Sequence, residues 1–210
     1  PPHAANLHVD DGRFSARIYN ANKVCKIPVL TINATCLNTG HPWEFTGSWV
    51  GEPARRELYE REQNSIAILP QLRFDGTFQD ARDRKIESWQ LGKLNSIWLS
   101  DAVAASAAVP AVFPPLPIHD LYRNSVGGEL VVELSDGGVF DNQGLAAVLL
   151  AKCTHIIVSD ASGQIVDESL LSTSMVGVAQ RANDVMMERI RGYGYFDMGL
   201  RREVFPKISA

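Results

Sequence analysis

The chain has 210 residues, of which 45% are hydrophobic and 21% charged, and its formal net charge is −4. This composition is typical of a globular chain with an apolar core, and we expect residues 1–210 to form a single domain. The negative charge argues against a nucleic-acid partner, because phosphate backbones bind basic surfaces.

The cysteine spacing and the lack of long apolar runs indicate the cellular compartment of the protein. Cys25, Cys36 and Cys153 lack paired spacing, which favours buried free thiols in a reducing compartment over a disulfide framework. No run of about 18 apolar residues is present, so we expect no membrane-spanning helix. The sequence predicts a cytoplasmic protein or one in peripheral contact with a membrane.

The sequence lacks the usual motifs for metals and nucleotides. His3 and His8, with Asp10 and Asp11 nearby, do not have a recognised ligand spacing. The Walker phosphate loop is also absent. We therefore expect no metal and no cofactor, calcium included.

The first third of the chain reads mainly as strands. Apolar and β-branched residues predict a buried strand at 26–35, turn residues follow at 38–42, and a strand resumes at 43–45. A short charged helix is expected at 55–63. The charged segment 74–87 has no clear period and is expected to be a mobile surface segment.

A helix of small residues is predicted in the middle of the chain. Ser100 and Asp101 have the character of a helix N-terminus, and the small residues 102–109 follow up to Pro110. Such a helix lets other elements approach closely. The proline-rich segment 113–117 must be extended.

The last third predicts a βαβ unit. A strand is expected at 129–134, a helix at 144–152, a second strand at 154–160 and a long helix at 168–191. Strand, helix and strand in close succession favour a parallel sheet. The predicted fold class is therefore α/β.

One aspartate lies at the carboxyl end of a predicted strand, where parallel sheets usually carry their functional residues. Glu133–Leu145 reads ELSDGGVFDNQGL, so Asp136 directly follows the predicted strand. Gly137 and Gly138 allow a sharp turn and the close approach of another element. Asp136 is suited to accept a proton from a neighbouring group, and an ordinary turn capped by this carboxylate is the alternative.

Three segments carry a family resemblance. The stretch ELSDGGVFDNQGL resembles the Asp-Gly-Gly motif of the patatin-like phospholipases. DAVAASAAVPAVFPPL, at 101–116, is similar to the family's small-residue helix and the Pro-Phe-Pro segment after it. PVLTINATCLNTGHPWEF, at 28–45, is similar to the strand and turn that precede that helix. The three segments occur in the family's order and cover about half the chain.

The resemblance implies a fold and an activity. It implies a three-layer α/β/α architecture with a mainly parallel central sheet, and a serine lipid acyl hydrolase with a Ser-Asp dyad. Asp136 would be the base that deprotonates the serine, and Gly137 and Gly138 would shape the turn beside it. The substrate would be a lipid or another ester, bound with peripheral membrane contact. The alternative is a non-catalytic relative that binds lipid or a protein partner.

The family's nucleophile motif is missing from the sequence. No serine lies in Gly-x-Ser-x-Gly, since the segment 47–51 places Ser48 one position early and Ser106 reads as close packing inside the small-residue helix. A glycine-rich loop for the oxyanion hole is also missing before the first strand. We expect the chain to be the C-terminal portion of a longer catalytic domain, whose N-terminal segment carries the nucleophile.

Further residues are candidates for the site. Phe113, Pro114 and Leu116 would line an acyl-chain groove, or would belong to the core or to a rigid connection. Asn33 and Thr35 would face the site or pack at the end of their strand.

Two polar residues that follow Asp136 in the sequence are further candidates. Asn142 is expected to tie the Gly-Gly turn by side-chain hydrogen bonds. Asp160, at the end of the second predicted strand, is a candidate second acid.

Overall fold

A computed structural model describes most of the chain. It describes residues 20, 22–24, 26–53, 69, 71–73, 78–79, 88–123, 126–151, 153, 155–159, 165, 167, 169–170 and 172–204. The predicted helix at 55–63 and most of the segment 74–87 lie outside these residues. Within that segment, Phe78–Gln79 forms a short strand.

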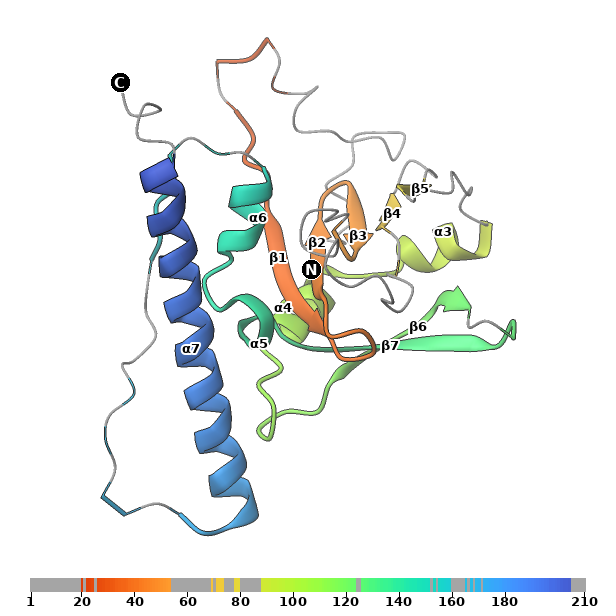
Figure 1. Cartoon of the computed structure of the whole chain (residues 1–210). Coiled ribbons are helices and arrows are strands. Elements are labelled where there is room, and N and C mark those ends of the chain that lie inside the picture. Colours follow the sequence, from red (N-terminus) through yellow and green to blue (C-terminus); the bar gives the residue numbers. More distant parts are fainter. Residues whose placement is uncertain are drawn as a thin grey trace.

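Within the described residues, seven strands form one sheet in the order β5-β4-β3-β2-β1-β7-β6 (Figure 1). The strands are β1 (Thr31–Cys36), β2 (Pro42–Thr46), β3 (Trp49–Gly51), β4 (Gln71–Arg73), β5 (Phe78–Gln79), β6 (Leu116–Arg123) and β7 (Glu129–Asp136). In Figure 1, β6 and β7 run across the direction of β1, so the sheet changes direction between its two halves.

The expected fold class is wrong. Every strand pair described in the sheet is antiparallel, whereas the three-layer α/β/α fold needs a mainly parallel sheet. The strands β1 and β2 form one hairpin, β6 and β7 form another, and β1 joins the two hairpins by pairing with β7. Hairpins of neighbouring strands therefore replace the predicted crossover.

The second strand of the predicted βαβ unit does not form. Residues 155–159 are not in a strand, and the Ile157 side chain is 98% exposed. The physical reason lies in β7, which has β1 on one side and β6 on the other. A strand that follows the next helix finds no free edge of β7 to pair with.

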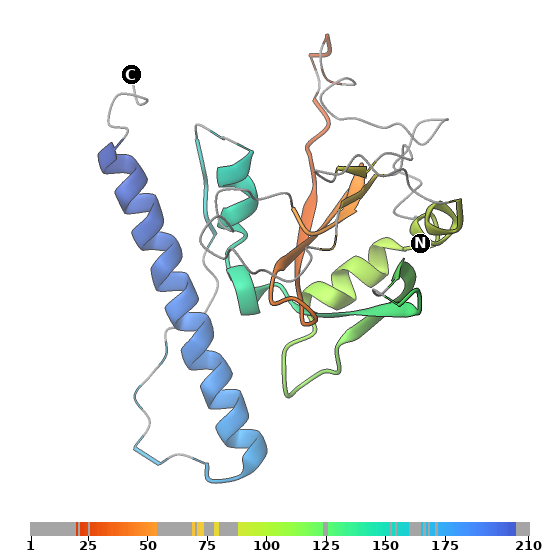
Figure 2. The same cartoon turned by 45° about the vertical axis from the view of Figure 1, so that its right-hand side comes forward.

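Five described helices accompany the sheet. They are α3 (Ser88–Leu94), α4 (Leu99–Ser106), α5 (Gly138–Asp141), α6 (Leu145–Leu150) and α7 (Met175–Val204). The helix α4 packs on β1, β6 and β7, and α5 lies between β1 and α7. In both views α7 stands at one edge of the molecule (Figures 1 and 2).

The helices α4 and α7 begin or end at other residues than the sequence predicted. The helix α4 begins at Leu99, where the Asp101 carboxylate accepts the backbone N–H of Trp98 at 2.8 Å. The acid in the first turn is thus confirmed, and the cap is not Ser100. The long helix was expected at 168–191, and α7 begins and ends later, at Met175 and Val204.

The apolar core lies on the face of the sheet that α4 covers. Ala102 and Ala105 of α4 are buried, which confirms that the small residues permit close packing. The indole ring of Trp43 meets the ring of Tyr122 edge to face at 6.2 Å. The buried core residues are Ala34, Cys36, Trp43, Phe45, Val50, Leu69, Leu72, Leu94, Ile97, Ala102, Ala105, Ile118, Leu121, Tyr122, Val132 and Leu134.

Two expectations about thiols and membranes can be compared with this structure. Cys36 is buried as a free thiol, but the free thiol of Cys153 is exposed, so the expected burial is wrong for Cys153. Cys25 lies outside the described residues. None of the helices described here is both long and apolar enough to cross a membrane.

Candidate functional site

Asp136 is the last residue of β7 and continues its apolar face. Side chains alternate along a strand, so Val132, Leu134 and Asp136 share one side of the sheet. Val132 and Leu134 belong to the core, and Ala34 lies directly opposite Asp136 in β1. The small side chain of Ala34 leaves room beside the carboxylate, which is half-buried at the end of the apolar face.

The backbone of Asp136 is held from two directions. Its N–H donates to the Ala108 carbonyl at 3.0 Å, and its carbonyl accepts the Thr35 hydroxyl at 2.8 Å. Ser135 reinforces the first contact, because its hydroxyl donates to the same Ala108 carbonyl at 2.9 Å. Thr35 therefore lies at the candidate site, where it positions the backbone of Asp136.

The environment of Asp136 favours the protonated form. Partial burial raises the pKa of the Asp136 carboxyl, and the hydrogen bond from the Gly138 N–H opposes this effect. That bond joins the Gly138 nitrogen to Asp136 Oδ1 at 2.6 Å. Among the described residues, no cation pairs with the carboxylate. A desolvated carboxylate with a raised pKa and no counter-ion is typical of functional sites.

Asp136 also caps the turn, as the alternative interpretation predicted. The hydrogen bond from the Gly138 N–H occupies Oδ1. Within the described part of the chain, Oδ2 has no hydrogen-bond partner. The same carboxylate can therefore cap the turn with one oxygen and accept a proton with the other.

Gly137 is required by the strand beside it. A Cβ at this position would lie 2.6 Å from the backbone oxygen of Asn33, closer than real Cβ atoms come to other heavy atoms. The backbone of β1 cannot move aside without breaking the sheet. The first glycine thus allows β7 to turn into α5 directly against β1.

Gly138 is required by three side chains. A Cβ there would lie 2.6 Å from Met187 Cε, 2.8 Å from Asn142 Oδ1 and 2.9 Å from Asp136 Oδ1. The second glycine therefore lets α7 and the carboxylate approach the same turn. The expected hydrogen bonds of Asn142 are absent among the described residues, and Asp136 itself ties the turn instead.

Asn33 brings a second polar group to this end of the sheet. Its backbone packs against Gly137, and its Nδ2 lies 2.9 Å from where a Cβ of Gly144 would be. Its Oδ1 is buried and has no hydrogen-bond partner within the described residues. A buried acceptor without a donor is rare in native proteins and is consistent with a site that binds a donor group.

Phe113 and Pro114 lie in the loop between α4 and β6. Ala108 lies at the start of this loop, and its carbonyl accepts the backbone N–H of Asp136. The Phe113 side chain is 58% exposed, and Val112 beside it is also exposed. The role of Phe113 and Pro114 in substrate binding stays a prediction.

The acid of the following helix has a structural role. Asp141 accepts the N–H groups of Leu145 and Ala146 at 3.2 and 2.7 Å, which satisfies donors at the start of α6. Asp160 lies outside the described residues. The described residues contain no group of three or more side chains suited to hold a metal ion.

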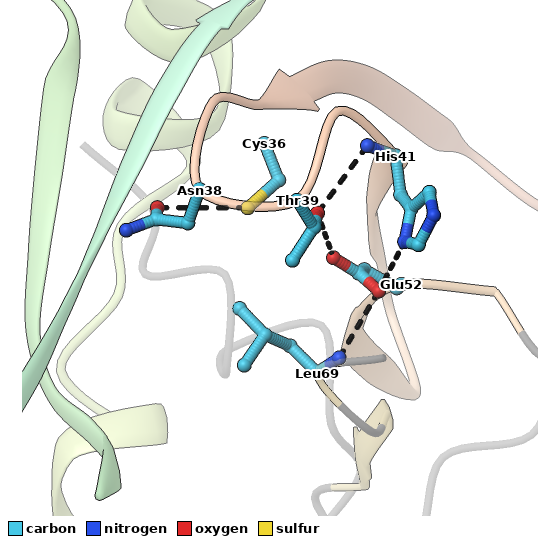
Figure 3. A network of polar contacts seen from close by, with 6 residues as sticks. All are labelled: Cys36, Asn38, Thr39, His41, Glu52 and Leu69. Atoms are coloured by element: carbon cyan, nitrogen blue, oxygen red, sulfur yellow. Dashed lines mark hydrogen bonds and ion pairs between the residues drawn. The ribbon is translucent and has the colours of Figure 1, made fainter. Parts of the chain in front are cut away.

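A second polar cluster lies at the other end of β1 and was not predicted (Figure 3). Glu52, directly after β3, is only 1% exposed. Its carboxylate accepts the Thr39 hydroxyl at 2.5 Å and the Leu69 N–H at 3.0 Å, and it lies 3.1 Å from His41 Nδ1. The carboxylate thus joins the β1–β2 turn to the segment before β4. A glutamate beside a proline gives no sequence signal for such burial.

Burial controls the protonation of this cluster. It raises the pKa of the Glu52 carboxyl, against the hydrogen bonds from Thr39, His41 and Leu69. Burial also raises the pKa of the Cys36 thiol, so that thiol is a poor nucleophile. Because Glu52, His41 and Leu69 are buried, we assign the cluster to stability and not to catalysis.

Comparison of this chain with family models, with curated proteins and with solved structures finds no match.

Proposed function

We propose that the chain belongs to a serine acyl hydrolase for lipids or other esters, in which Asp136 is the general base. The observation that carries the proposal is the Asp136 carboxylate itself. It is half-buried at the end of β7, it has a raised pKa, and no cation neutralises it within the described residues. The proposal concerns this chemistry and not the three-layer architecture, which the antiparallel sheet excludes.

In the proposed reaction, a serine Oγ attacks the ester carbonyl carbon and Asp136 accepts the hydroxyl proton. The leaving alcohol takes that proton, and an acyl-enzyme remains. Water then attacks the acyl group, Asp136 accepts a proton from the water, and the proton returns to the serine oxygen as the acid leaves. The raised pKa supports this role, because a carboxylate in water is too weak a base for an alcohol.

We place the serine outside these 210 residues, since the sequence has no Gly-x-Ser-x-Gly. Two described serines lie near Asp136, and neither suits the role. The hydroxyl of Ser135 is buried and donates to the Ala108 carbonyl. Ser106 is the last residue of α4 and not at a strand-to-helix elbow. The nucleophile on a further segment of the complete enzyme is thus part of the proposal.

An apolar substrate is supported by the loop that is bonded to Asp136. Val112 and Phe113 on this loop, and Val103 on α4, are each more than half exposed. Exposed apolar side chains near a site favour an acyl chain over a polar substrate, and a lipid substrate would bring peripheral membrane contact. A non-catalytic protein that binds lipid or a protein partner is the second candidate, favoured by the absence of the Gly-x-Ser-x-Gly motif from this sequence.

The test is ester hydrolysis by the complete protein with Asp136→Asn. Asparagine keeps the oxygen that accepts the Gly138 N–H but cannot accept the serine proton, so we expect about a 10²- to 10⁴-fold loss of kcat. Asp120→Asn, at an exposed aspartate of β6, is the matched control and should retain activity. Activity of Asp136→Asn within a few-fold of wild type rules out the base. Failure of a fluorophosphonate probe to label any serine assigns the protein to the binding alternative.

A further inference from the structure

The helix α7 turns a long apolar face away from the rest of the protein. Met187 packs at Gly138, and Asn183 is buried, so one side of α7 faces α5. On the far side, Met175 is 88% exposed, Tyr193 66% and Phe196 64%. Figures 1 and 2 show α7 at the margin of the molecule.

The residues on this face follow a heptad pattern. From 175 to 196 they are spaced alternately by three and four, which is the repeat of helices that pair with other helices. We name them the outer seam: Met175, Val178, Ala182, Val185, Arg189, Gly192 and Phe196. Met186 and Tyr193 lie beside the seam and are also exposed. The seam is about 32 Å long at 1.5 Å per residue.

From these observations we propose that two copies of the protein associate through the outer seam, with their α7 helices antiparallel. When Ala182 is placed opposite Val185 of the second copy, Val178 lies opposite Arg189 and Met175 lies opposite Gly192. Because a two-fold axis relates the two copies, each of these contacts occurs twice in the dimer. A face that pairs with itself in this way forms a closed dimer.

A protruding side chain and a shallow depression on the same face support this register. Around Gly192 the surface has a shallow, open depression of about 370 Å³, lined by Arg189, Gly192, Tyr193 and Phe196. The proposed register places the exposed Met175 of the second copy at this depression. A long, flexible side chain opposite a glycine is the knobs-into-holes arrangement of paired helices.

The exposed apolar area also favours a second copy. The six large exposed apolar side chains on and beside the seam, at roughly 150–200 Å² each when fully exposed, present on the order of 600 Å² per copy. This is close to the roughly 800 Å² per partner of a standard interface.

A lipid surface fits the helix less well. The helix α7 has five arginines and four acidic residues, for a net charge of +1. Helices that lie in membrane interfaces have a strongly basic polar face. The charges of α7 are instead mixed, as they are in helices that pair with protein.

The test is the solution mass of the complete protein, measured by sedimentation at micromolar concentrations. We expect a dimer for the wild type and a dissociation constant at least about 100-fold weaker for Val185→Glu, which buries a charge in the seam. Gln180→Glu is the matched control, because it adds the same charge to α7 at an exposed position away from the seam and should remain dimeric. Circular dichroism should show equal helix content in both variants.

Cysteine cross-linking tests the register, in a background where Cys25 and Cys153 are serine. Val178→Cys with Arg189→Cys should form a disulfide between copies on mild oxidation. Val178→Cys alone should not, because the two positions 178 are about 16 Å apart along the antiparallel axis. A wild-type monomer, a dimer that survives Val185→Glu, or a cross-link through position 178 alone overturns the proposal. A monomer that binds phosphatidylcholine vesicles through this face would assign the seam to lipid instead.

Discussion

Asp136 has a property that few surface carboxylates share, because it is partly buried without a paired cation among the described residues. Burial of this kind is unfavourable for the charged form. This property is the basis of the proposed role of Asp136 as a base. The same property makes its effect on stability measurable.

The pH dependence of stability should change in Asp136→Asn. The folded state holds the Asp136 proton to higher pH than the unfolded chain does, so this group lowers stability as pH rises above the ordinary carboxyl pKa of about 4. Asparagine has no proton to lose, and we expect the variant to be at least as stable as the wild type at neutral pH. Urea unfolding at about pH 4 and pH 7 measures the difference. A variant that loses stability on going to neutral pH as steeply as the wild type would contradict the assignment.

The two glycines should respond differently to alanine. Gly137→Ala meets the backbone of Asn33, which cannot yield, and we expect a loss of about 2–4 kcal/mol. Gly138→Ala meets only side-chain atoms, of Met187, Asn142 and Asp136, which can shift, so its loss should be smaller, at about 1–2 kcal/mol.

Gly92→Ala is the control for this glycine pair. It lies in α3 with nothing within 4 Å of the added Cβ, and it should stabilise the protein by about 0.5–1 kcal/mol. Equal losses at positions 137 and 138, measured by urea unfolding, would show that the strand does not set the constraint.

The residues of the candidate site were predictable only in part. The strand pattern followed by Asp-Gly-Gly marked Asp136, Gly137 and Gly138, because a strand end and glycine conformations are local properties. The position of Asn33 beside Gly137 depends on the pairing of β1 with β7, which are about a hundred residues apart. Burial of Glu52 likewise depends on contacts with Thr39 and Leu69 that no local pattern specifies.

At the scale of elements, the Glu52 carboxylate joins the β1–β2 turn to the segment before β4. Glu52→Ala would leave the Thr39 hydroxyl, the His41 ring and the Leu69 N–H without their acceptor. Each buried donor without a partner costs about 1–3 kcal/mol, and removal of a desolvated charge offsets part of the sum. We expect a loss of about 3 kcal/mol in urea unfolding.

The matched control for Glu52 is Glu129→Ala. Glu129 also accepts a backbone N–H, from Asp120, and lies 3.1 Å from His119 Nδ1, but its side chain is exposed to water. Its removal should have a much smaller effect. A similar loss in the two variants would show that burial does not determine the contribution of Glu52.

The elements themselves were predicted more reliably than their partners. The strands at β1 and β7 and the helices at α4 and α6 lie close to where apolar patterns and small residues predicted them. The strand β6 was missed, because Pro117 and two charged or polar residues interrupt its apolar pattern. The strand expected at 154–160 has the right composition, but composition does not supply a neighbouring strand.

At the scale of the whole molecule, the direction of the strands decides the fold. A strand–helix–strand pattern favours a parallel crossover, but β7 is already paired on both sides within its antiparallel sheet. This arrangement depends on long-range contacts, which the single sequence does not reveal. Asp136 nevertheless stays at a strand end, because that position depends only on β7 and its turn.

The proposed dimer and the proposed active site share one element. The helix α7 carries the outer seam on one side and contacts Gly138 through Met187 on the other. Pairing of two α7 helices would hold Met187 against the turn that positions Asp136. The two proposals are still separable, because Val185→Glu changes the solution mass and Asp136→Asn changes hydrolysis.

The most direct test of Asp136 as the base is the pH profile of kcat/KM for ester hydrolysis by the complete protein. We predict an acidic limb that reports one ionisation, with an apparent pKa above the ordinary aspartate value of about 3.9, and loss of that limb together with the activity in Asp136→Asn. A limb that persists unchanged in Asp136→Asn would show that another group accepts the proton.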